Sequence, residues 1–347
     1  MKKPAGIKKA DFEIKKNVPL APLTTFGIGG PADFFVEAKT TDELVKIIEY
    51  CQENKIPFFI LGGGSNILVS DKGFRGMVIK NKSSEIKLVG KNKILVDSGV
   101  LNSRLVKFTA DKGLAGVEFL IGIPGTVGGA VRHNARFRSP KSFYKYFTDF
   151  NLVKDCFIGD LVESVTLLTG DKKIKKVDKN YCQFDYGNSG LRSKFTRPRP
   201  DEVGKKRKDI ILKVLLKLER GNEKTIQGTV QKLLQWRLTR STENGKRQAP
   251  DPISGSLTTQ PKGKSAGCVF SNTSNKDNHP AGRLIDMAGL KGKKIGGAQI
   301  SPLHANFIIN LKNAKAKDVL ALIKLAKKEI KKKFNVTLKE EIDLVGF

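Results

Sequence analysis

The segment Leu61–Val69, which reads LGGGSNILV, constrains the fold of this chain more than any other. An apolar run, residues 56–61, leads directly into it. Three consecutive glycines allow the backbone to turn sharply with positive φ, and they leave several N–H groups on one side of the turn. Such a concave row of amides binds anions, and Ser65 and Asn66 add side-chain donors. The segment therefore predicts an anion-binding loop that follows a strand.

Two further loops share these properties. Residues 121–130 read IGIPGTVGGA, about sixty positions after the first loop, and residues 27–32 read GIGGPA. A single glycine loop is commonly no more than a turn. Three of them in one chain favour a long ligand with a diphosphate in the middle.

Composition limits the classes of protein to which the chain can belong. With 347 residues and 39% hydrophobic side chains, it is long enough for two domains. No apolar run approaches the roughly 20 residues that span a bilayer, and no apolar signal core follows the basic N-terminus. The cysteines form no CxxC pair, which argues against a metal site and fits a reducing cytoplasm; they are Cys51, Cys156, Cys182 and Cys268.

The charge is strongly positive, because 64 Lys and Arg face 34 Asp and Glu, giving a net +30. Such a balance is typical of nucleic-acid binding. Here, however, the basic residues are spread along the whole chain, and aromatic side chains make up only 7%. This distribution favours a generally basic surface, with no specific nucleic-acid or membrane partner. Such a surface would speed the arrival of an anionic substrate.

The periodicity of the chain predicts mixed helices and strands. Thr40 and Glu43 form a capping box, and the helix behind them has one apolar face made of Leu44, Ile47, Ile48 and Cys51. With strands at 56–61 and 77–79 this helix completes a β-α-β unit. Later predictions are strands at 93–98, 161–169, 210–218, 307–311 and 336–347, and helices at 102–112, 223–238 and 317–333.

The domain organisation follows from these elements. We predict a basic tail at 1–16, a first domain at 17–219 and a second at 220–347, with the final strand able to pack back on the first. The helix at 223–238, with Ile226, Val230, Leu233 and Leu234 on one face, would open the second domain. Two segments lack periodicity: 133–155 is predicted to be an inserted excursion, and 239–264 a long loop.

The motifs together resemble one enzyme family. Residues 24–32 (TTFGIGGPA), then LGGGSNILV, then IPGTVGGAV at 123–131, resemble the flavin domain of the UDP-N-acetylenolpyruvoylglucosamine reductase (MurB) family, in its shorter second type. In the second half SAGCVF at 265–270, LIDMAGLKG at 284–292 and HANFI at 304–308 follow in the family's order. The resemblance runs from about residue 17 to residue 347. The first-half motifs alone would indicate only the wider vanillyl-alcohol-oxidase-like (PCMH) flavoproteins.

This resemblance implies an α+β fold, with a two-lobed FAD-binding domain and a C-terminal substrate domain. It implies FAD as cofactor and NADPH as hydride donor in the reduction of an enolpyruvyl UDP-sugar to UDP-N-acetylmuramate, by a cytoplasmic and monomeric enzyme. The FAD diphosphate would lie on the glycine loops, with these residues as contacts: Gly62, Gly63, Gly64, Ser65, Asn66, Ile123, Pro124, Gly125, Thr126, Gly128 and Gly129.

The same resemblance implies catalytic residues. Adding hydride to an enol ether beside a carboxylate builds negative charge, so the site needs cations and an acid. The acid position falls on Cys268, where serine is commoner in the family; a thiol has a pKa of roughly 8.5, and we expect cationic surroundings to lower it further. Glu341 falls on the family's catalytic glutamate. Without the resemblance, Cys268 would be interpreted as an inert core thiol and Glu341 as a surface residue.

The third catalytic position departs from the family. The family has an arginine directly after the tyrosine of a Phe-x-Tyr segment, and here Tyr186 is followed by Gly187. Two interpretations stay open: Arg192 takes the role, or the site has lost its main cation. Asn272 and His304 lie where the family contacts substrate. The alternatives to the reductase are a different FAD oxidoreductase on the same fold, a catalytically impaired relative, and a basic nucleic-acid-binding protein.

Overall fold

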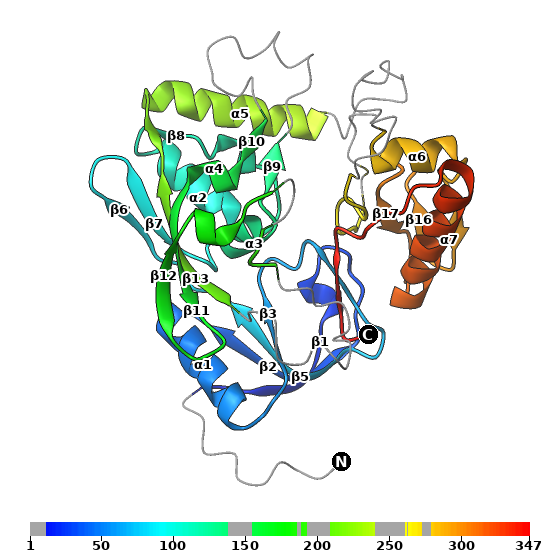
Figure 1. Ribbon diagram of the computed structural model, residues 1–347, viewed down its shortest axis with the longest axis horizontal. Coiled ribbons are helices and arrows are strands. Elements are labelled where there is room, and N and C mark those ends of the chain that lie inside the picture. The colour runs from blue at the N-terminus through cyan, green and yellow to red at the C-terminus, as the bar shows by residue number, and fades with distance from the viewer. Residues whose placement is uncertain are drawn as a thin grey trace.

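The structure is a computed structural model that describes residues 12–137, 155–185, 189–192, 209–239, 261, 263–272 and 279–347. The chain forms a larger lobe of two sheets and their helices, and a smaller lobe that contains the C-terminal helices (Figure 1). The last strand leaves the smaller lobe and returns to the larger one. The predicted mixture of helices and strands is therefore observed.

The first sheet is built around the predicted β-α-β unit. Its strand order is β1 (Lys15–Pro19), β2 (Pro31–Ala38), β5 (Phe74–Asn81) and β3 (Phe58–Leu61), parallel except for β1. Helix α1 (Thr41–Glu53) begins where predicted, because the Thr40 hydroxyl accepts a hydrogen bond from the Glu43 amide at 3.1 Å. Its predicted apolar face is buried against this sheet. Strand β1 begins at Lys15, so it takes in the last two residues of the predicted tail.

The second sheet is antiparallel throughout. Its order is β12 (Ile174–Asp178), β11 (Val162–Leu168), β13 (Ile210–Lys217), β7 (Lys93–Asp97) and β6 (Ile86–Val89). Helices α2 (Asn102–Ala110), α3 (Val127–Arg132) and α4 (Ile158–Leu161) lie on it, as do the short helical turns 118–120 and 180–182. The largest core cluster forms between these layers, around Val96, Leu105, Phe119, Val131 and Val214.

Helix α5 (Glu223–Thr239) packs with the larger lobe and not with the smaller one. Its Ile226 is fully buried against Ala110 and Ala115, and its Leu233 belongs to the large core cluster. A short pair of strands, β8 (Leu114–Ala115) and β14 (Glu219–Arg220), leads the chain into this helix. The packing therefore differs from the predicted domain boundary at 219/220. Leu234, predicted to share the buried face, is 39% exposed.

The smaller lobe packs two helices on a three-stranded antiparallel sheet. The strands are β15 (Lys294–Ile295), β16 (Ala298–Ile300) and β17 (Ile308–Asn310), and the helices are α6 (Ala281–Met287) and α7 (Ala316–Phe334). The predicted face of α7 is buried: Val319, Leu322, Ile323, Ala326 and Ile330. Among the described residues, no helix is long and apolar enough to cross a membrane.

The two lobes share a core and a helix cap. Phe26, Ile28 and Leu68 of the larger lobe are buried in the smaller lobe's cluster. The carboxylate of Asp71 accepts hydrogen bonds from the first amides of α7, at 2.7 Å from Ala316 and 3.1 Å from Lys317. These contacts fix the smaller lobe against the segment that contains the first glycine loop.

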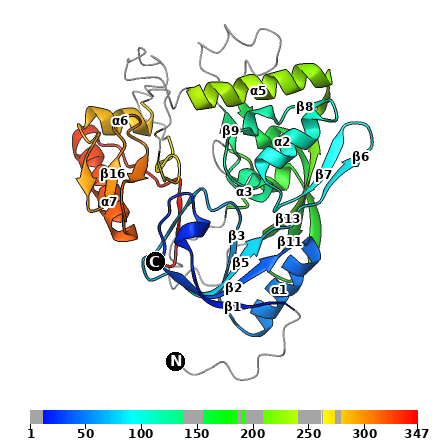
Figure 2. The ribbon, with the colours of Figure 1, turned by 180° about the vertical axis from the view of Figure 1, so that it is seen from behind.

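The last strand fastens the C-terminus to the same place. Strand β18 (Asp343–Val345) pairs in parallel with β4 (Ile67–Val69), with Asp343 opposite Ile67. β4 follows directly on the first glycine loop, and in Figure 2 the C-terminus lies beside the larger lobe. The strand is shorter than the predicted 336–347. It nevertheless places Glu341, two residues before it, next to the glycine loop.

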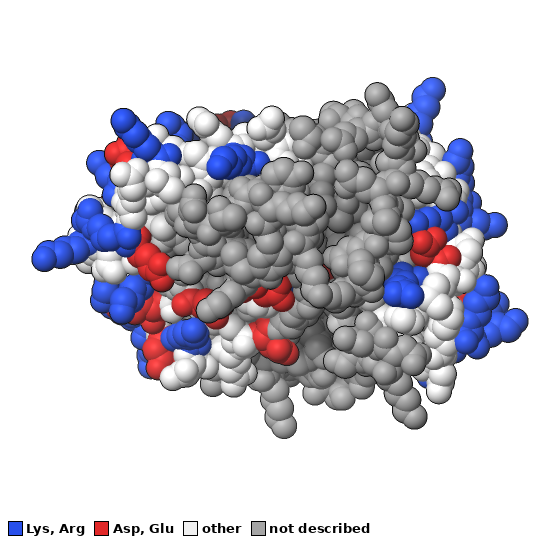
Figure 3. Space-filling model, turned by 90° about the horizontal axis from the view of Figure 1, so that it is seen from above, with Lys and Arg blue, Asp and Glu red and all other residues white. Residues whose placement is uncertain are grey.

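The described part of the face seen from above carries basic side chains at both of its ends (Figure 3). Lysines and arginines project from the outer sides of both lobes in this view, with acidic side chains among them (Figure 3). Several lysines are paired with carboxylates at the surface, as Lys82 is with Glu37 at 2.7 Å. This distribution agrees with a generally basic surface.

Candidate active site

The two longer glycine loops touch each other through their backbones. A Cβ atom on Gly63 would lie 2.5 Å from the Cα of Gly125, so the contact requires glycine at position 63. The Ser65 hydroxyl donates a hydrogen bond to the Pro124 carbonyl at 2.8 Å. A Cβ on Gly62 would lie 2.8 Å from the Thr126 hydroxyl. Loops about sixty residues apart in the sequence therefore form one surface.

The first loop offers the amides that an anion needs. Within the part of the chain that the structure describes, the N–H groups of residues 63–66 donate to no protein acceptor. Gly64 takes positive φ (67°), which turns this row of amides to one side. A narrow glycine surface with free donors fits the diphosphate of a dinucleotide such as FAD.

The second loop contributes shape more than donors. The amides of Val127 and Gly128 donate to the carbonyls of Val100 and Ser98, both at 2.8 Å, and Thr126 caps α3 by accepting from the Gly129 amide. A Cβ on Gly128 would lie 2.8 Å from the Cβ of Ser98. Gly128 and Gly129 therefore hold the loop in place. Ile123, half-buried, and Pro124, exposed, lie at its open side.

The third loop joins the first to the smaller lobe. The Thr25 amide donates to the Gly64 carbonyl at 3.0 Å, and the Thr25 hydroxyl donates to the Ser265 carbonyl at 2.7 Å. Ser265 opens the segment that leads to Cys268. The predicted cofactor loops and the predicted acid are thus connected by hydrogen bonds.

Cys268 and Glu341 lie on two segments that pair with each other. The Glu341 amide donates to the Val269 carbonyl at 2.7 Å, and Phe270 forms an antiparallel bridge with Glu340. Asn306 locks the first segment, since its side chain accepts from the Phe270 amide at 2.9 Å and donates to the Phe270 carbonyl at 2.8 Å. Two residues 73 positions apart are brought to one site by this pairing.

The thiol of Cys268 keeps its proton more firmly than predicted. Burial raises its pKa to about 12, and the Glu341 carboxylate acts in the same direction. Arg136 and a hydrogen bond with Asn306 oppose the rise. The expectation that cationic surroundings lower this pKa is wrong, because desolvation of the thiolate outweighs the nearby charge.

Glu341 faces Arg136. The Arg136 guanidinium NH1 lies 3.5 Å from Oε1 of Glu341, and the two side chains are only 20% and 18% exposed. The other oxygen, Oε2, is buried and accepts no hydrogen bond from the described residues. Burial raises the pKa of Glu341, while Arg136, His133 and Arg192 oppose the rise. A buried acid with one unsatisfied oxygen is typical of a site that receives a ligand.

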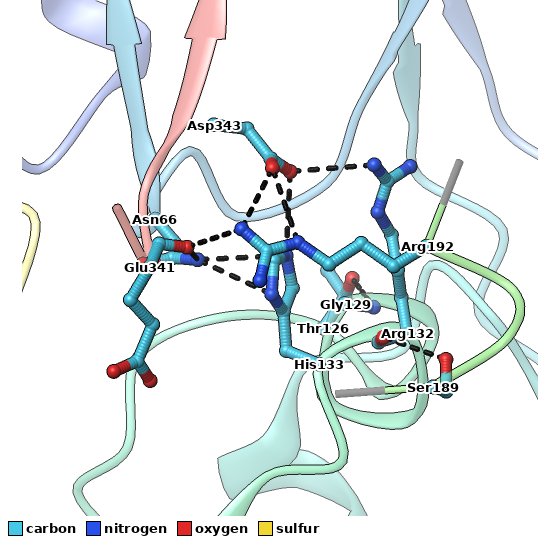
Figure 4. Close-up of polar contacts among 9 residues, drawn as sticks. All are labelled: Asn66, Thr126, Gly129, Arg132, His133, Ser189, Arg192, Glu341 and Asp343. Carbon is cyan, nitrogen blue, oxygen red and sulfur yellow. Dashed lines mark hydrogen bonds and ion pairs between the residues drawn. The ribbon is translucent and has the colours of Figure 1, made fainter. Parts of the chain in front are cut away.

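A second carboxylate, Asp343, collects the cations of α3 and of the 189–192 segment. Arg132 NH2 lies 3.3 Å from Oδ2, His133 Nε2 lies 3.4 Å from the same oxygen, and Arg192 NH2 lies 3.1 Å from Oδ1. Figure 4 shows the two guanidinium groups converging on Asp343, whereas the carboxylate of Glu341 points away from them. Asp343 itself is the first residue of β18.

Arg192 therefore lies behind Glu341 and not in front of its carboxylate. Its guanidinium donates to the main-chain carbonyl of Glu341 at 2.6 Å and to Asp343. The Asn66 side chain donates a hydrogen bond to the same carbonyl at 3.1 Å. Its side chain therefore contacts the segment that leads into the last strand, while its main-chain amide belongs to the first glycine loop. Gly187, which stands where the family has an arginine, lies outside the described residues.

Asn272 and His304 meet at the start of α6. The Asn272 side chain accepts a hydrogen bond from the Ala281 amide at 3.1 Å, and a Cβ on Gly282 would lie 3.2 Å from the His304 ring. Burial, and then Lys291, lower the pKa of His304 to about 4, so its imidazole is neutral at pH 7. Both residues lie in the smaller lobe, and the His304 ring nitrogen Nδ1 accepts a hydrogen bond from the Asn306 amide at 3.2 Å.

Three residues of the site were not named from the sequence. Arg136 belongs to Asn134-Ala135-Arg136, which follows α3 and leads into β9. Asn306 lies inside the family-like HANFI motif. Asp343 is an acidic residue within the apolar run IDLV at 342–345, and this run was the available signal, because a charge in a buried strand requires partners. In the described residues no cluster of three metal-ligating side chains occurs.

Replacing Asp343 with asparagine tests the cation cluster. Burial alone raises the pKa of Asp343, but the hydrogen bond from His133 and the charges of Arg132 and Arg192 outweigh it and hold the pKa at about 2. A depressed carboxylate pKa adds stability above the unfolded-state pKa of roughly 3.9, and this stability is lost as the pH falls through about 2. Asp343→Asn should therefore lower the free energy of unfolding by about 3 kcal/mol at pH 7.

Urea denaturation at pH 7 and in acid measures this effect. The difference between wild type and Asp343→Asn should narrow toward zero as the pH approaches 2. The exposed Glu53 of α1 gives a matched control, and Glu53→Gln should change stability by less than about 0.5 kcal/mol. If Asp343→Asn is less stable than wild type by the same free energy of unfolding at both pH values, the result would contradict the link between stability and the ionisation of Asp343.

Comparison with known proteins agrees with this geometry. Residues 260–345 match the C-terminal domain of UDP-N-acetylenolpyruvoylglucosamine reductase, and residues 32–147 match an FAD binding domain. Enzymes of that name from Desulfosudis oleivorans and Clostridium novyi are 35% and 34% identical to this chain, over 96% of it and over 95% and 92% of their own lengths.

A solved structure extends the match to the fold. The crystal structure of UDP-N-acetylenolpyruvylglucosamine reductase from Thermus caldophilus superposes with a TM-score of 0.67 at 30% identity, covering 96% of this chain and 99% of that one. The predicted α+β fold with an FAD-binding domain is thereby confirmed. This chain belongs to the UDP-N-acetylenolpyruvoylglucosamine reductase family.

Proposed function

We propose that this protein reduces the enolpyruvyl ether of a UDP-N-acetylglucosamine derivative to UDP-N-acetylmuramate, with FAD as cofactor and NADPH as hydride donor. The observation that carries the proposal is the hydrogen bond between Glu341 and Val269, because it brings the expected acid and the expected glutamate to one place. That place adjoins the glycine loops, since Asn66 of the first loop contacts the main chain of Glu341. Membership of the reductase family agrees with it.

The glycine loops would hold the cofactor. The free amides of residues 63–66 suit the diphosphate, and the close approach of Gly63 and Gly125 leaves a flat backbone surface without side chains. Bound FAD supplies the hydride chemistry, and the protein supplies orientation and charge.

Cys268 would protonate the substrate. In the overall reaction the C=C bond gains a hydride on one carbon and a proton on the carbon that bears the carboxylate. Because its pKa is raised to about 12, the thiol is protonated at neutral pH and has a proton to give. The thiolate that remains regains a proton from solvent. Asn306 holds the segment that presents the thiol.

Glu341 and Arg192 would have different tasks. Burial raises the pKa of Glu341, and its Oε2 has no hydrogen-bond partner among the described residues, so this oxygen can contact the substrate. Arg192 contacts the main chain of Glu341 and the carboxylate of Asp343, and it would position Glu341 from behind. Asn272 and His304 would contact the UDP-sugar from the smaller lobe.

An anaerobic titration tests the reaction. NADPH added to the FAD-loaded protein should bleach the flavin absorbance, and the enolpyruvyl UDP-sugar should restore it. Bleaching without recovery would contradict the substrate assignment and favour a different acceptor. A fast reoxidation by oxygen, with none by the sugar, would favour an oxidase on the same fold.

Replacement of Cys268 separates the two half-reactions. Cys268→Ala should slow reoxidation by the sugar about 10²- to 10⁴-fold while reduction by NADPH keeps its rate, because only the second half-reaction needs the acid. Cys268→Ser should keep most of the activity, since a hydroxyl can occupy the same position and donate a proton. Stopped-flow absorbance measures both steps, and equal reoxidation rates for Cys268→Ala and wild type would exclude the acid role.

Replacement of Gly63 tests the cofactor loops. The methyl group of Gly63→Ala would meet the backbone of Gly125, push the loops apart and weaken FAD binding by about tenfold or more. Gly228→Ala is the matched control, because no atom lies within 4 Å of a Cβ there and alanine favours the helix α5. Flavin content after dialysis measures the effect. Full FAD retention in Gly63→Ala would contradict the assigned loop.

A further inference from the structure

Arg136 has no assigned part in the reaction, yet it is the basic residue paired with the carboxylate of Glu341. Its guanidinium lies 3.5 Å from Oε1, and the side chain is 20% exposed. It also acts electrostatically on the thiol of Cys268. A partly buried cation that is paired with Glu341 and acts electrostatically on Cys268 is placed for charge that develops during the reaction.

The local fold holds Arg136 in this direction. It belongs to the two-residue strand β9 (Arg136–Phe137), which pairs with β10 (Cys156–Phe157). Phe137 is buried with its ring 5.7 Å from that of Trp236. Since successive side chains of a strand point to opposite sides, the burial of Phe137 directs Arg136 away from this core. Asn134, which is buried, ties the preceding turn to Gly159 at 2.9 Å.

The other nearby cations have a different anion. Arg132 and Arg192 both pair with Asp343, at 3.3 and 3.1 Å. Figure 4 shows the Glu341 carboxylate directed away from both of them. The site therefore has two layers of charge: Asp343 with its cations behind the main chain of Glu341, and Arg136 on the side of the Glu341 carboxylate and the thiol.

We propose that Arg136 binds the carboxylate of the substrate and stabilises the negative charge that develops beside it, in place of the arginine that the sequence lacks at Gly187. This inference rests on the proposed function. Hydride addition to the terminal carbon leaves an electron pair on the neighbouring carbon, which spreads into the carboxylate oxygens. A guanidinium has five N–H donors and can contact two carboxyl groups, so Glu341 and the substrate can share Arg136. Transfer of the proton from Cys268 to this neighbouring carbon then neutralises the charge.

An equilibrium experiment isolates the carboxylate contact. UDP-N-acetylmuramate carries a lactyl ether that ends in the carboxylate, and UDP-N-acetylglucosamine lacks this ether, so the ratio of their affinities for the FAD-loaded protein reports on the lactyl group and its carboxylate. Arg136→Gln should weaken UDP-N-acetylmuramate by about 10- to 100-fold and leave UDP-N-acetylglucosamine unchanged. Arg136→Lys should recover part of the preference. Calorimetric titration measures both ligands.

Control variants make the result specific. Arg104 on α2 is an exposed arginine, and Arg104→Gln should keep the wild-type preference. Arg192→Gln should lower thermal stability as well as the affinity for UDP-N-acetylmuramate, because it removes the ion pair with Asp343 and loosens the support of Glu341. A retained preference in Arg136→Gln, or an equal loss for both ligands, would overturn the proposal.

A kinetic arm separates this inference from the proposed function. The enolpyruvyl sugar should reoxidise the reduced flavin of Arg136→Gln about 10²- to 10³-fold more slowly than that of wild type. Reduction of the flavin by NADPH should keep its rate. Reoxidation of Arg136→Gln at the wild-type rate would overturn the role of Arg136 and leave the reductase standing. Failure of wild type itself would overturn both.

Discussion

The pairing of β18 with β4, reinforced by the ion pairs of Asp343, is the constraint on which the site depends. Glu341 lies where the chain returns from the smaller lobe to the larger one. A shift of the last strand by one residue would turn the Glu341 carboxylate to the other face. Three side chains from the larger lobe prevent this shift by holding Asp343. Asn66 and Arg192 hold the Glu341 carbonyl as well. The strand thus fixes the position of Glu341, the proposed catalytic glutamate, relative to the first glycine loop.

The same arrangement separates charges that would otherwise interfere. Arg132 and Arg192 are largely compensated by Asp343, whose pKa of about 2 keeps it ionised. Burial at Cys268 and Glu341 instead favours the protonated forms. A site that must deliver a proton to a carbon beside a carboxylate benefits from this contrast, because the acid retains its proton until negative charge develops next to it.

Sequence patterns predicted what short-range physics decides. The Thr40 cap, the buried face of α1 and the glycines of the loops depend on spacing along a few residues, and the structure has them as predicted. The direction of Arg192 and the raised pKa of Cys268 depend on segments that meet only in the folded chain. Helix α5 was assigned to the second domain for the same reason: its apolar face was visible in the sequence, but the surface that buries it was not.

This chain has Gly187 where the family has an arginine, but a cation still lies close to Glu341. A transition state responds to where a charge lies in space, and the sequence position that supplies the charge does not matter. In this chain the two-residue strand β9 places Arg136 next to Glu341. A cation on β9 has its backbone fixed by β10 and by the burial of Phe137, so the Arg136 guanidinium is held next to Glu341.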